Sequence, residues 1–148
     1  LRAELLEEYE SNLLKHGGAF EGIKEMLASL EDDGIPYGIV TNKPLRFAEP
    51  ILINEPAFKN CKTLICPDHL DAIKPDPEGI LRGCKDLGIH PTECVYVGDH
   101  AKDIEAGINA GTEVIACYFG YSLKIGDCSE HILGANHPNE LYELISKL

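Results

Sequence analysis

The sequence has 148 residues, a length that suits one domain with one hydrophobic core. It carries 25 Asp and Glu against 13 Lys and Arg, a formal net charge of -12. Because nucleic acids and anionic membranes are bound by basic surfaces, this charge argues against both as partners. No apolar run approaches the roughly 20 residues of a membrane span. Any site for an anion must therefore be built locally, from a lysine, a helix N-terminus or a metal ion.

Apolar periodicity predicts the elements in chain order. Residues 1–16 have helical spacing, and because the chain begins at Leu1 rather than Met, we interpret them as the end of a helix in a longer protein. Residues 21–34 predict an amphipathic helix, 35–40 a short apolar strand, and 45–53 a helix that Pro50 limits or kinks. Further strands are expected over 62–66, 93–99 and 112–120, and further helices over 77–88, 101–111 and 137–148.

Short apolar strands that alternate with helices indicate an α/β fold, with a Rossmann-like parallel sheet covered by helices on both faces. Six cysteines occur without a C-x-x-C pair. Four lie in or beside apolar runs, which predicts buried, reduced thiols in a cytoplasmic protein rather than disulfides or a zinc site: Cys66, Cys84, Cys94 and Cys117.

In a parallel sheet, ligands bind beyond the carboxyl ends of the strands. Thr41 and Asn42 follow the first predicted strand, and Lys74 follows the second. Asp99 and Asp103 follow the third, four positions apart. We expect these five residues to meet at one edge of the sheet.

Taken singly, each residue has a structural interpretation. Thr41 and Asn42 could cap a helix or form a turn, and Lys74 could be a solvated surface lysine, as we interpret Lys43. Asp99 could be an N-cap, and Asp103 a first-turn acid favoured by the helix dipole. We read His100 as an exposed helix-start residue.

The combination favours phosphoryl chemistry. A hydroxyl, an amide and an ammonium can hold the oxygens of a phosphate. Paired carboxylates such as Asp99 and Asp103 are hard ligands for Mg2+, which offsets their mutual repulsion. Both could approach one ion, or Asp99 could ligate while Asp103 orients the site.

The motifs "IVTNK" (39–43), "KPDPE" (74–78) and "VGDHAKDIEAGINAG" (97–111) resemble the haloacid dehalogenase superfamily of phosphohydrolases. The resemblance covers roughly residues 20–148. It implies that Thr41 and Asn42 bind the phosphate, that Lys74 bridges phosphate and nucleophile, that Asp99 ligates Mg2+, and that Asp103 supports the metal site. Such enzymes hydrolyse phosphate esters of small metabolites through an aspartyl-phosphate.

The superfamily's nucleophile motif, Asp-x-Asp-Gly-Thr after an N-terminal strand, does not occur in the sequence. The resemblance therefore divides the chain into a C-terminal remnant of a helical cap (1–18) and an α/β core (19–148) without its central first strand. A missing central strand would leave a gap of about 10 Å with two unpaired edges. We accordingly expect this stretch alone to be inactive, and to fold poorly or associate.

The strings "TNKPLRFAEPI", "LICPDHL" and "FGY" are similar to phosphoglycolate phosphatases and to the proteobacterial branch with N-acetylmuramic acid 6-phosphate phosphatase. The expected substrate is thus 2-phosphoglycolate or a sugar phosphate such as N-acetylmuramate 6-phosphate. Haloacid dehalogenation would leave the two aspartates unexplained, and a phosphomutase would need further cap residues. The alternative to an enzyme is a non-catalytic module that binds a phosphorylated ligand or a protein. The sequence gives no oligomeric state.

Overall fold

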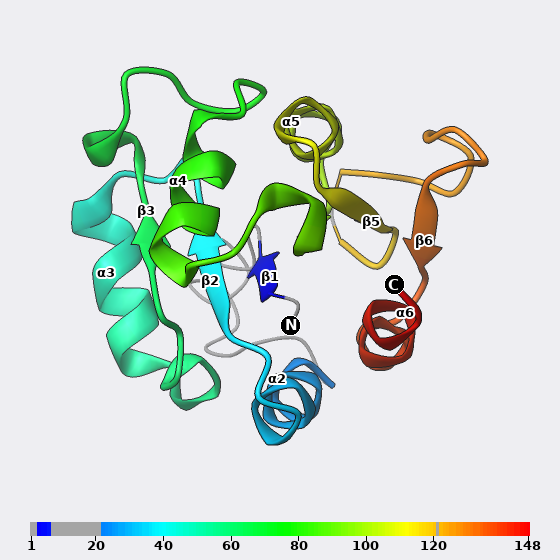
Figure 1. Cartoon of the computed structure of the whole chain (residues 1–148), viewed down its shortest axis with the longest axis horizontal. Helices are drawn as coiled ribbons and strands as arrows, with labels where there is room; N and C mark the ends of the chain where they lie inside the picture. Colours follow the sequence, from blue (N-terminus) through cyan, green and yellow to red (C-terminus); the bar gives the residue numbers. More distant parts are fainter. Residues whose placement is uncertain (1–2, 7–21, 121) are drawn as a thin grey trace.

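The computed structural model describes residues 3–6, 22–120 and 122–148 (Figure 1). Its centre is a sheet of six strands in the order β3-β2-β1-β4-β5-β6, and every neighbouring pair is parallel. The strands are β1 (Ala3–Leu6), β2 (Tyr37–Val40), β3 (Leu64–Ile65), β4 (Cys94–Gly98), β5 (Glu113–Cys117) and β6 (Leu133–Ala135). The helices are α2 (Ile23–Asp32), α3 (Leu45–Asn54), α4 (Glu78–Leu87), α5 (Ala101–Ala110) and α6 (Leu141–Lys147).

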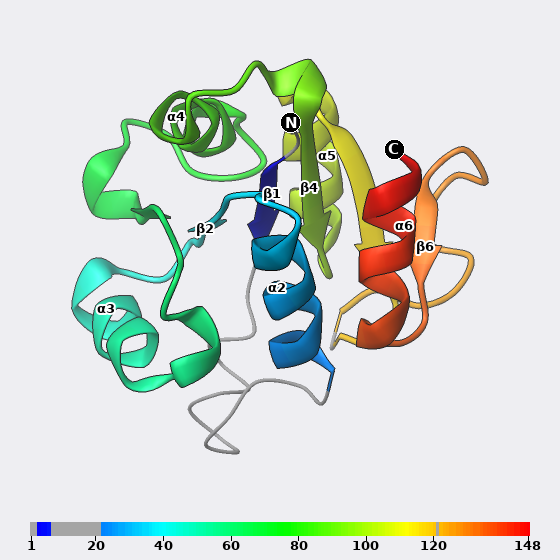
Figure 2. The ribbon, with the colours of Figure 1, turned by 60° about the horizontal axis from the view of Figure 1, so that its bottom comes forward.

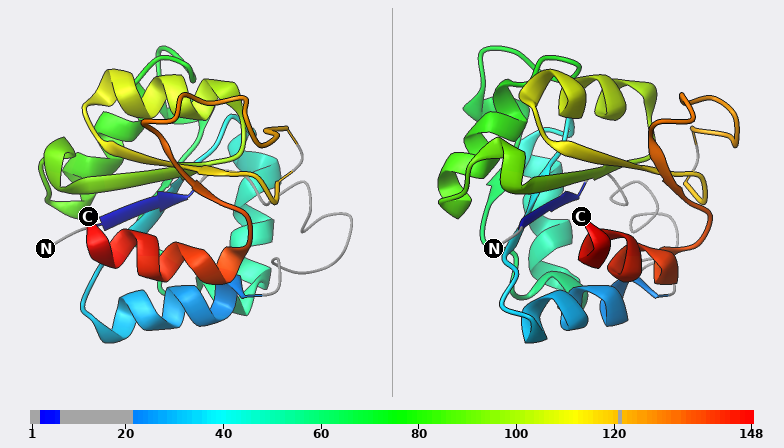
Figure 3. Two further views of the ribbon diagram at one scale, coloured as in Figure 1. Left: turned by 90° about the vertical axis from the view of Figure 1, so that its right-hand side faces the viewer. Right: turned by 45° about the vertical axis from the view of Figure 1, so that its right-hand side comes forward.

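Helices cover both faces of the sheet, as predicted (Figure 3). Alternate residues of β4 show why: Val95 and Val97 pack in one core cluster with α2 and α6. Cys94 and Tyr96 point the other way, into a cluster with α4 and α5. Both faces of β4 are thus fully buried, which explains its continuous apolar run.

The N-terminal strand corrects one expectation. The position between β2 and β4, expected to be empty, is occupied by β1 (Figure 2), which comes from residues expected to be helical. Leu5 pairs with Gly38 on one side and with Tyr96 on the other. Two open strand edges offer backbone hydrogen bonds on both sides of a short segment, and this outweighs its helical spacing. The expected unpaired edges are therefore absent from the described sheet. Residues 7–18 of the predicted cap remnant lie outside the described residues.

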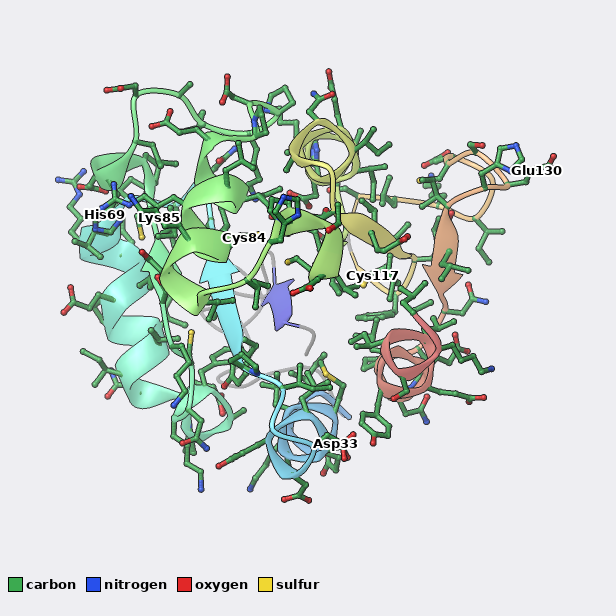
Figure 4. All side chains as sticks on the ribbon, in the orientation of Figure 1. Asp33, His69, Cys84, Lys85, Cys117 and Glu130 are labelled. Atoms are coloured by element: carbon green, nitrogen blue, oxygen red, sulfur yellow. The ribbon has the colours of Figure 1, made fainter. Side chains whose placement is uncertain are left out.

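Other predicted elements are confirmed with small shifts at their ends. Pro50 does not end α3, which continues to Asn54. The predicted C-terminal helix begins with a 3-10 turn, Pro138–Glu140, before α6. A hydrogen bond joins α6 to the end of α2. The Tyr142 hydroxyl of α6 donates it to the carboxylate of Asp33, which Figure 4 labels at the end of α2.

The predicted burial of four cysteines is confirmed. The four thiols expected to be buried are buried, whereas Cys61 and Cys128 are partly exposed, and none of the six is in a disulfide. Figure 4 shows Cys84 on α4 and Cys117 on β5, in the different core clusters of the two sheet faces. Within the described residues, no helix is long and apolar enough to cross a membrane.

Candidate functional site

Four polar or charged residues are buried among those the structure describes, and all four had been predicted as site residues. Their exposed fractions are 1% for Thr41, 3% for Lys74, 6% for Asp99 and 1% for Asp103. Each follows the carboxyl end of a strand: β2 for Thr41, β3 for Lys74 and β4 for the two aspartates. Parallel pairing brings these ends to one edge of the sheet. Because polar burial is costly without partners, the contacts of these side chains decide what the site can do.

Lys74 and Asp103 form a buried ion pair. Lys74 Nζ donates to Asp103 Oδ1 at 2.9 Å and to the Val40 carbonyl at 3.4 Å. The ammonium also lies 6.0 Å from the centre of the Tyr96 ring, within reach of a cation–π attraction. The ion pair joins segments 29 residues apart, so Lys74 is not the solvated lysine of the alternative interpretation.

The second oxygen of Asp103 fixes the start of α5. Oδ2 accepts backbone N–H groups from Asp99 at 3.2 Å and from His100 at 3.0 Å. His100 itself is the exposed N-cap of α5 and accepts the Lys102 N–H, so the cap is His100 and not Asp99. Asp103 therefore holds the backbone of Asp99 with one oxygen and Lys74 with the other.

Thr41 and Asn42 complete the same edge. Thr41 Oγ1 accepts the Lys43 N–H at 3.0 Å, which makes the tight turn after β2. The half-buried Asn42 donates from Nδ2 to the Lys74 carbonyl at 3.4 Å. A chain of contacts thus runs from Asn42 through Lys74 and Asp103 to the backbone of Asp99.

Two glycines make room for the two aspartates, and sequence reasoning assigned neither this task. A methyl group on Gly98 would lie 2.8 Å from Asp103 Cγ, and one on Gly120 would lie 2.8 Å from Asp99 Cγ. Neither has a positive φ, so space rather than backbone conformation requires glycine. A signal existed for Gly120, since it follows β5 at the same edge of the sheet.

The donor set suits Mg2+ bound through one or two carboxylates. Asp103 accepts Lys74 on one oxygen and two backbone N–H groups on the other, so the chain itself holds this carboxylate in place. Asp99 directly follows β4 and is the residue that the sequence predicts as the metal ligand. The described residues contain no group of three acidic, His or Cys side chains able to hold a metal. Mg2+ commonly takes only one or two protein carboxylates, with water and phosphate oxygens completing its shell.

A cavity of about 700 Å³ lies beside this edge, between α5 and the segment after β5. Its apolar lining includes Ile104, Ile108, Leu123 and Ile132, and its polar lining includes His100 next to Asp99 in the sequence. None of the five predicted site residues lines it.

Comparison with known proteins gives consistent results. Residues 1–117 match the family described as haloacid dehalogenase-like hydrolase. An N-acetylmuramic acid 6-phosphate phosphatase of Pseudomonas aeruginosa is 40% identical, over 99% of this chain and 66% of that protein. A phosphoglycolate phosphatase of Xanthomonas campestris is 40% identical, over 84% of this chain and 55% of that protein.

The solved structures agree on the fold. A HAD-superfamily hydrolase of Ehrlichia chaffeensis superposes with a TM-score of 0.74 at 24% identity, over 87% of this chain and 58% of that one. This chain spans 66% and 55% of the length of the two curated relatives. The family match covers well over half of the 148 residues and includes all the predicted site residues. The chain therefore belongs to the haloacid dehalogenase-like hydrolase family.

Proposed function

We propose that the native protein containing this chain is a Mg2+-dependent hydrolase of phosphate monoesters, acting on a small phosphorylated metabolite. The observation that carries the proposal is the buried network at the carboxyl edge of the sheet. Its members come from three strand ends and include a hydroxyl, an amide, an ammonium and two carboxylates. A purely structural core would not bury two carboxylates and a lysine there, since apolar residues of equal volume are often more stabilising.

Each side chain has a distinct task in this proposal. The hydroxyl of Thr41 and the amide of Asn42 bind phosphate oxygens, and Lys74 balances the charge of the phosphate. Asp99 holds Mg2+, which neutralises negative charge on the transferring phosphoryl group when bound. Asp103 keeps Lys74 and the backbone of Asp99 in place, as its two sets of hydrogen bonds indicate.

The nucleophile is proposed to come from another part of the native protein. The superfamily's Asp-x-Asp-Gly-Thr motif does not occur in these 148 residues. An aspartate supplied from elsewhere would attack the phosphorus, and water would then hydrolyse the resulting aspartyl-phosphate. The isolated chain would lack that nucleophile and be inactive.

For the substrate, we propose N-acetylmuramate 6-phosphate first and 2-phosphoglycolate second. The relative named for the first substrate aligns with 99% of this chain, and the one named for the second with 84%. Both substrates are monoesters with a second anionic group, so phosphate binding alone does not distinguish them.

The test is hydrolysis of a panel of phosphate monoesters, including both of these, by the native protein with Mg2+ or with a chelator. We expect Mg2+-dependent release of phosphate that Asp99→Asn nearly abolishes. Lys43→Ala is the matched control, because this lysine is also at the edge but contributes only its backbone N–H to the network. Full activity of Asp99→Asn in the presence of chelator would refute the metal assignment.

A non-catalytic module is the second candidate, because Thr41, Asn42 and Lys74 could hold a phosphate without any nucleophile. It would bind the same monoesters at Thr41 and Lys74 without hydrolysing them. Calorimetric binding of an ester that the native protein leaves intact for hours, with Mg2+ present, would select this candidate.

A further inference from the structure

We propose that Gly120 is a positioning residue of the metal site, and that its lack of a side chain sets the orientation of the Asp99 carboxylate. This inference rests on the proposed function only in taking Asp99 as the Mg2+ ligand. The close approach of Gly120 to Asp99 is a feature of the described structure and does not depend on that function. Gly120 follows β5 and belongs to the string "FGY", outside the three motifs that carry the five predicted site residues.

A methyl group on Gly120 would clash with Asp99, and rotating the Asp99 side chain would not relieve the clash. A methyl group on Gly120 would lie 2.8 Å from Asp99 Cγ and closer still to both Cβ and Oδ2 of Asp99. Cβ is fixed by the backbone, so a different Asp99 rotamer would leave that clash in place. Either the Asp99 backbone or the segment that carries Gly120 would have to move.

Neither side moves freely. The Asp99 N–H donates to Asp103 Oδ2 at 3.2 Å, and the Asp99 carbonyl accepts the Leu123 N–H at 3.0 Å. Leu123 is 6% exposed and packs with Ile104 and Ala116. Leu123 is thus held against Asp99 by this hydrogen bond and by its own buried side chain, and both hydrogen bonds restrain the Asp99 backbone.

The consequence concerns metal binding more than folding. Mg2+ demands nearly ideal octahedral geometry at 2.0–2.1 Å, so a displaced carboxylate loses affinity steeply. Loss of a group that orients a metal ligand typically costs about 10- to 100-fold in metal affinity. We expect Gly120→Ala to weaken Mg2+ binding by at least about tenfold on this basis.

The experiment measures the affinity of the native protein for Mg2+ by calorimetry, together with the Mg2+-induced rise in Tm. Gly134→Ala is the matched control. Its new methyl group would also clash, at 3.1 Å from Tyr118 Cδ2 and closer to Cε2, but against a ring instead of a carboxylate. We expect Gly134→Ala to lower the Tm without Mg2+ and to leave the Mg2+ affinity within about twofold of the wild type, because the ring is no metal ligand.

A second pair of variants covers the case in which Gly120→Ala does not fold. Asp99→Gly removes the Cβ, Cγ and Oδ2 atoms that the methyl group would meet. Gly120→Ala should therefore lower the Tm in the Asp99 background and leave it nearly unchanged in the Asp99→Gly background. The inference is overturned if Gly120→Ala lowers the Tm equally in both backgrounds. It is also overturned if neither Gly120→Ala nor the double variant with Asp99→Gly folds.

The outcomes separate this inference from the proposed function. If the wild type and Asp99→Asn bind Mg2+ equally well, or if the wild type binds none, the metal assignment fails and this inference fails with it. If Asp99→Asn loses Mg2+ binding but Gly120→Ala retains wild-type affinity, only the role of Gly120 is wrong.

Discussion

The ion pair between Lys74 and Asp103 offers the sharpest test of the site's energetics. Lys74→Met keeps the long apolar stem of the side chain but leaves Asp103 Oδ1 without its cation. Asp103→Asn fails in both orientations of the amide: its NH2 group faces either the ammonium of Lys74 or the N–H groups of Asp99 and His100. Lys74→Met therefore leaves a buried carboxylate oxygen without its cation, and Asp103→Asn places a buried hydrogen-bond donor against another donor.

The magnitude follows from burial. The side chains of Lys74 and Asp103 are each 2% exposed. Removing one partner of such a pair typically costs about 3–5 kcal/mol. In the double variant the Asn oxygen can accept the two N–H groups and its NH2 meets no cation, so we expect a loss below the sum, by up to about 3 kcal/mol.

The assay is urea unfolding of the native protein followed by far-UV circular dichroism, for the wild type, both single variants and the double variant. A matched control is the exposed pair Lys147–Glu143, which has the same 2.9 Å separation but side chains 67% and 74% exposed. Its coupling should be about 0.5 kcal/mol or less. If the buried pair couples no more strongly than the exposed one, the reasoning is refuted.

Two further predictions concern stability away from the site. Burial raises the pKa of the Cys61 thiol from 9.0 to about 11, so the folded state disfavours the thiolate and loses stability as the pH rises from about 9 to 11. Over that interval the free energy of unfolding of the wild type should fall more than that of Cys61→Ala, by up to about 3 kcal/mol; parallel curves would contradict this. Gly79→Ala would bring a methyl group within 2.9 Å of Val40 Cγ1 and 3.1 Å of Leu70 Cδ1. Overpacking of about 1–3 kcal/mol outweighs the helix-propensity gain of about 1 kcal/mol, so we expect a net loss of up to about 2 kcal/mol in urea unfolding, and a more stable variant would show the packing argument to be wrong.

The convergence of the site could be predicted from the sequence because it depends on topology. Strands that read as continuous apolar runs belong to a parallel sheet, and all their carboxyl ends face one edge. That was sufficient to group Thr41, Lys74 and Asp99 before any contact was known. The pairing of Lys74 with Asp103 was not predictable, since it joins residues 29 positions apart through a turn whose direction the sequence does not encode.

Two parts of the fold escaped prediction for physical reasons. Residues 3–6 have helical spacing, but spacing does not reveal that β2 and β4 leave a place between them that a short segment can fill. Strand β6 has only three residues, with Leu133 exposed, so it lacks any period that could be recognised. The contact between Gly120 and Asp99 is likewise tertiary, and only the position of Gly120 after β5 pointed to it.

The central claim is that the carboxyl edge of the sheet binds a metal ion and a phosphate together. It is tested most directly by a crystal structure of the native protein grown with Mg2+ and inorganic phosphate. The account predicts Mg2+ on the carboxylate of Asp99, phosphate within hydrogen-bond distance of Thr41 and Lys74, and an intact ion pair between Lys74 and Asp103. Mg2+ and phosphate bound away from these residues, with Asp99 making no metal contact, would contradict it.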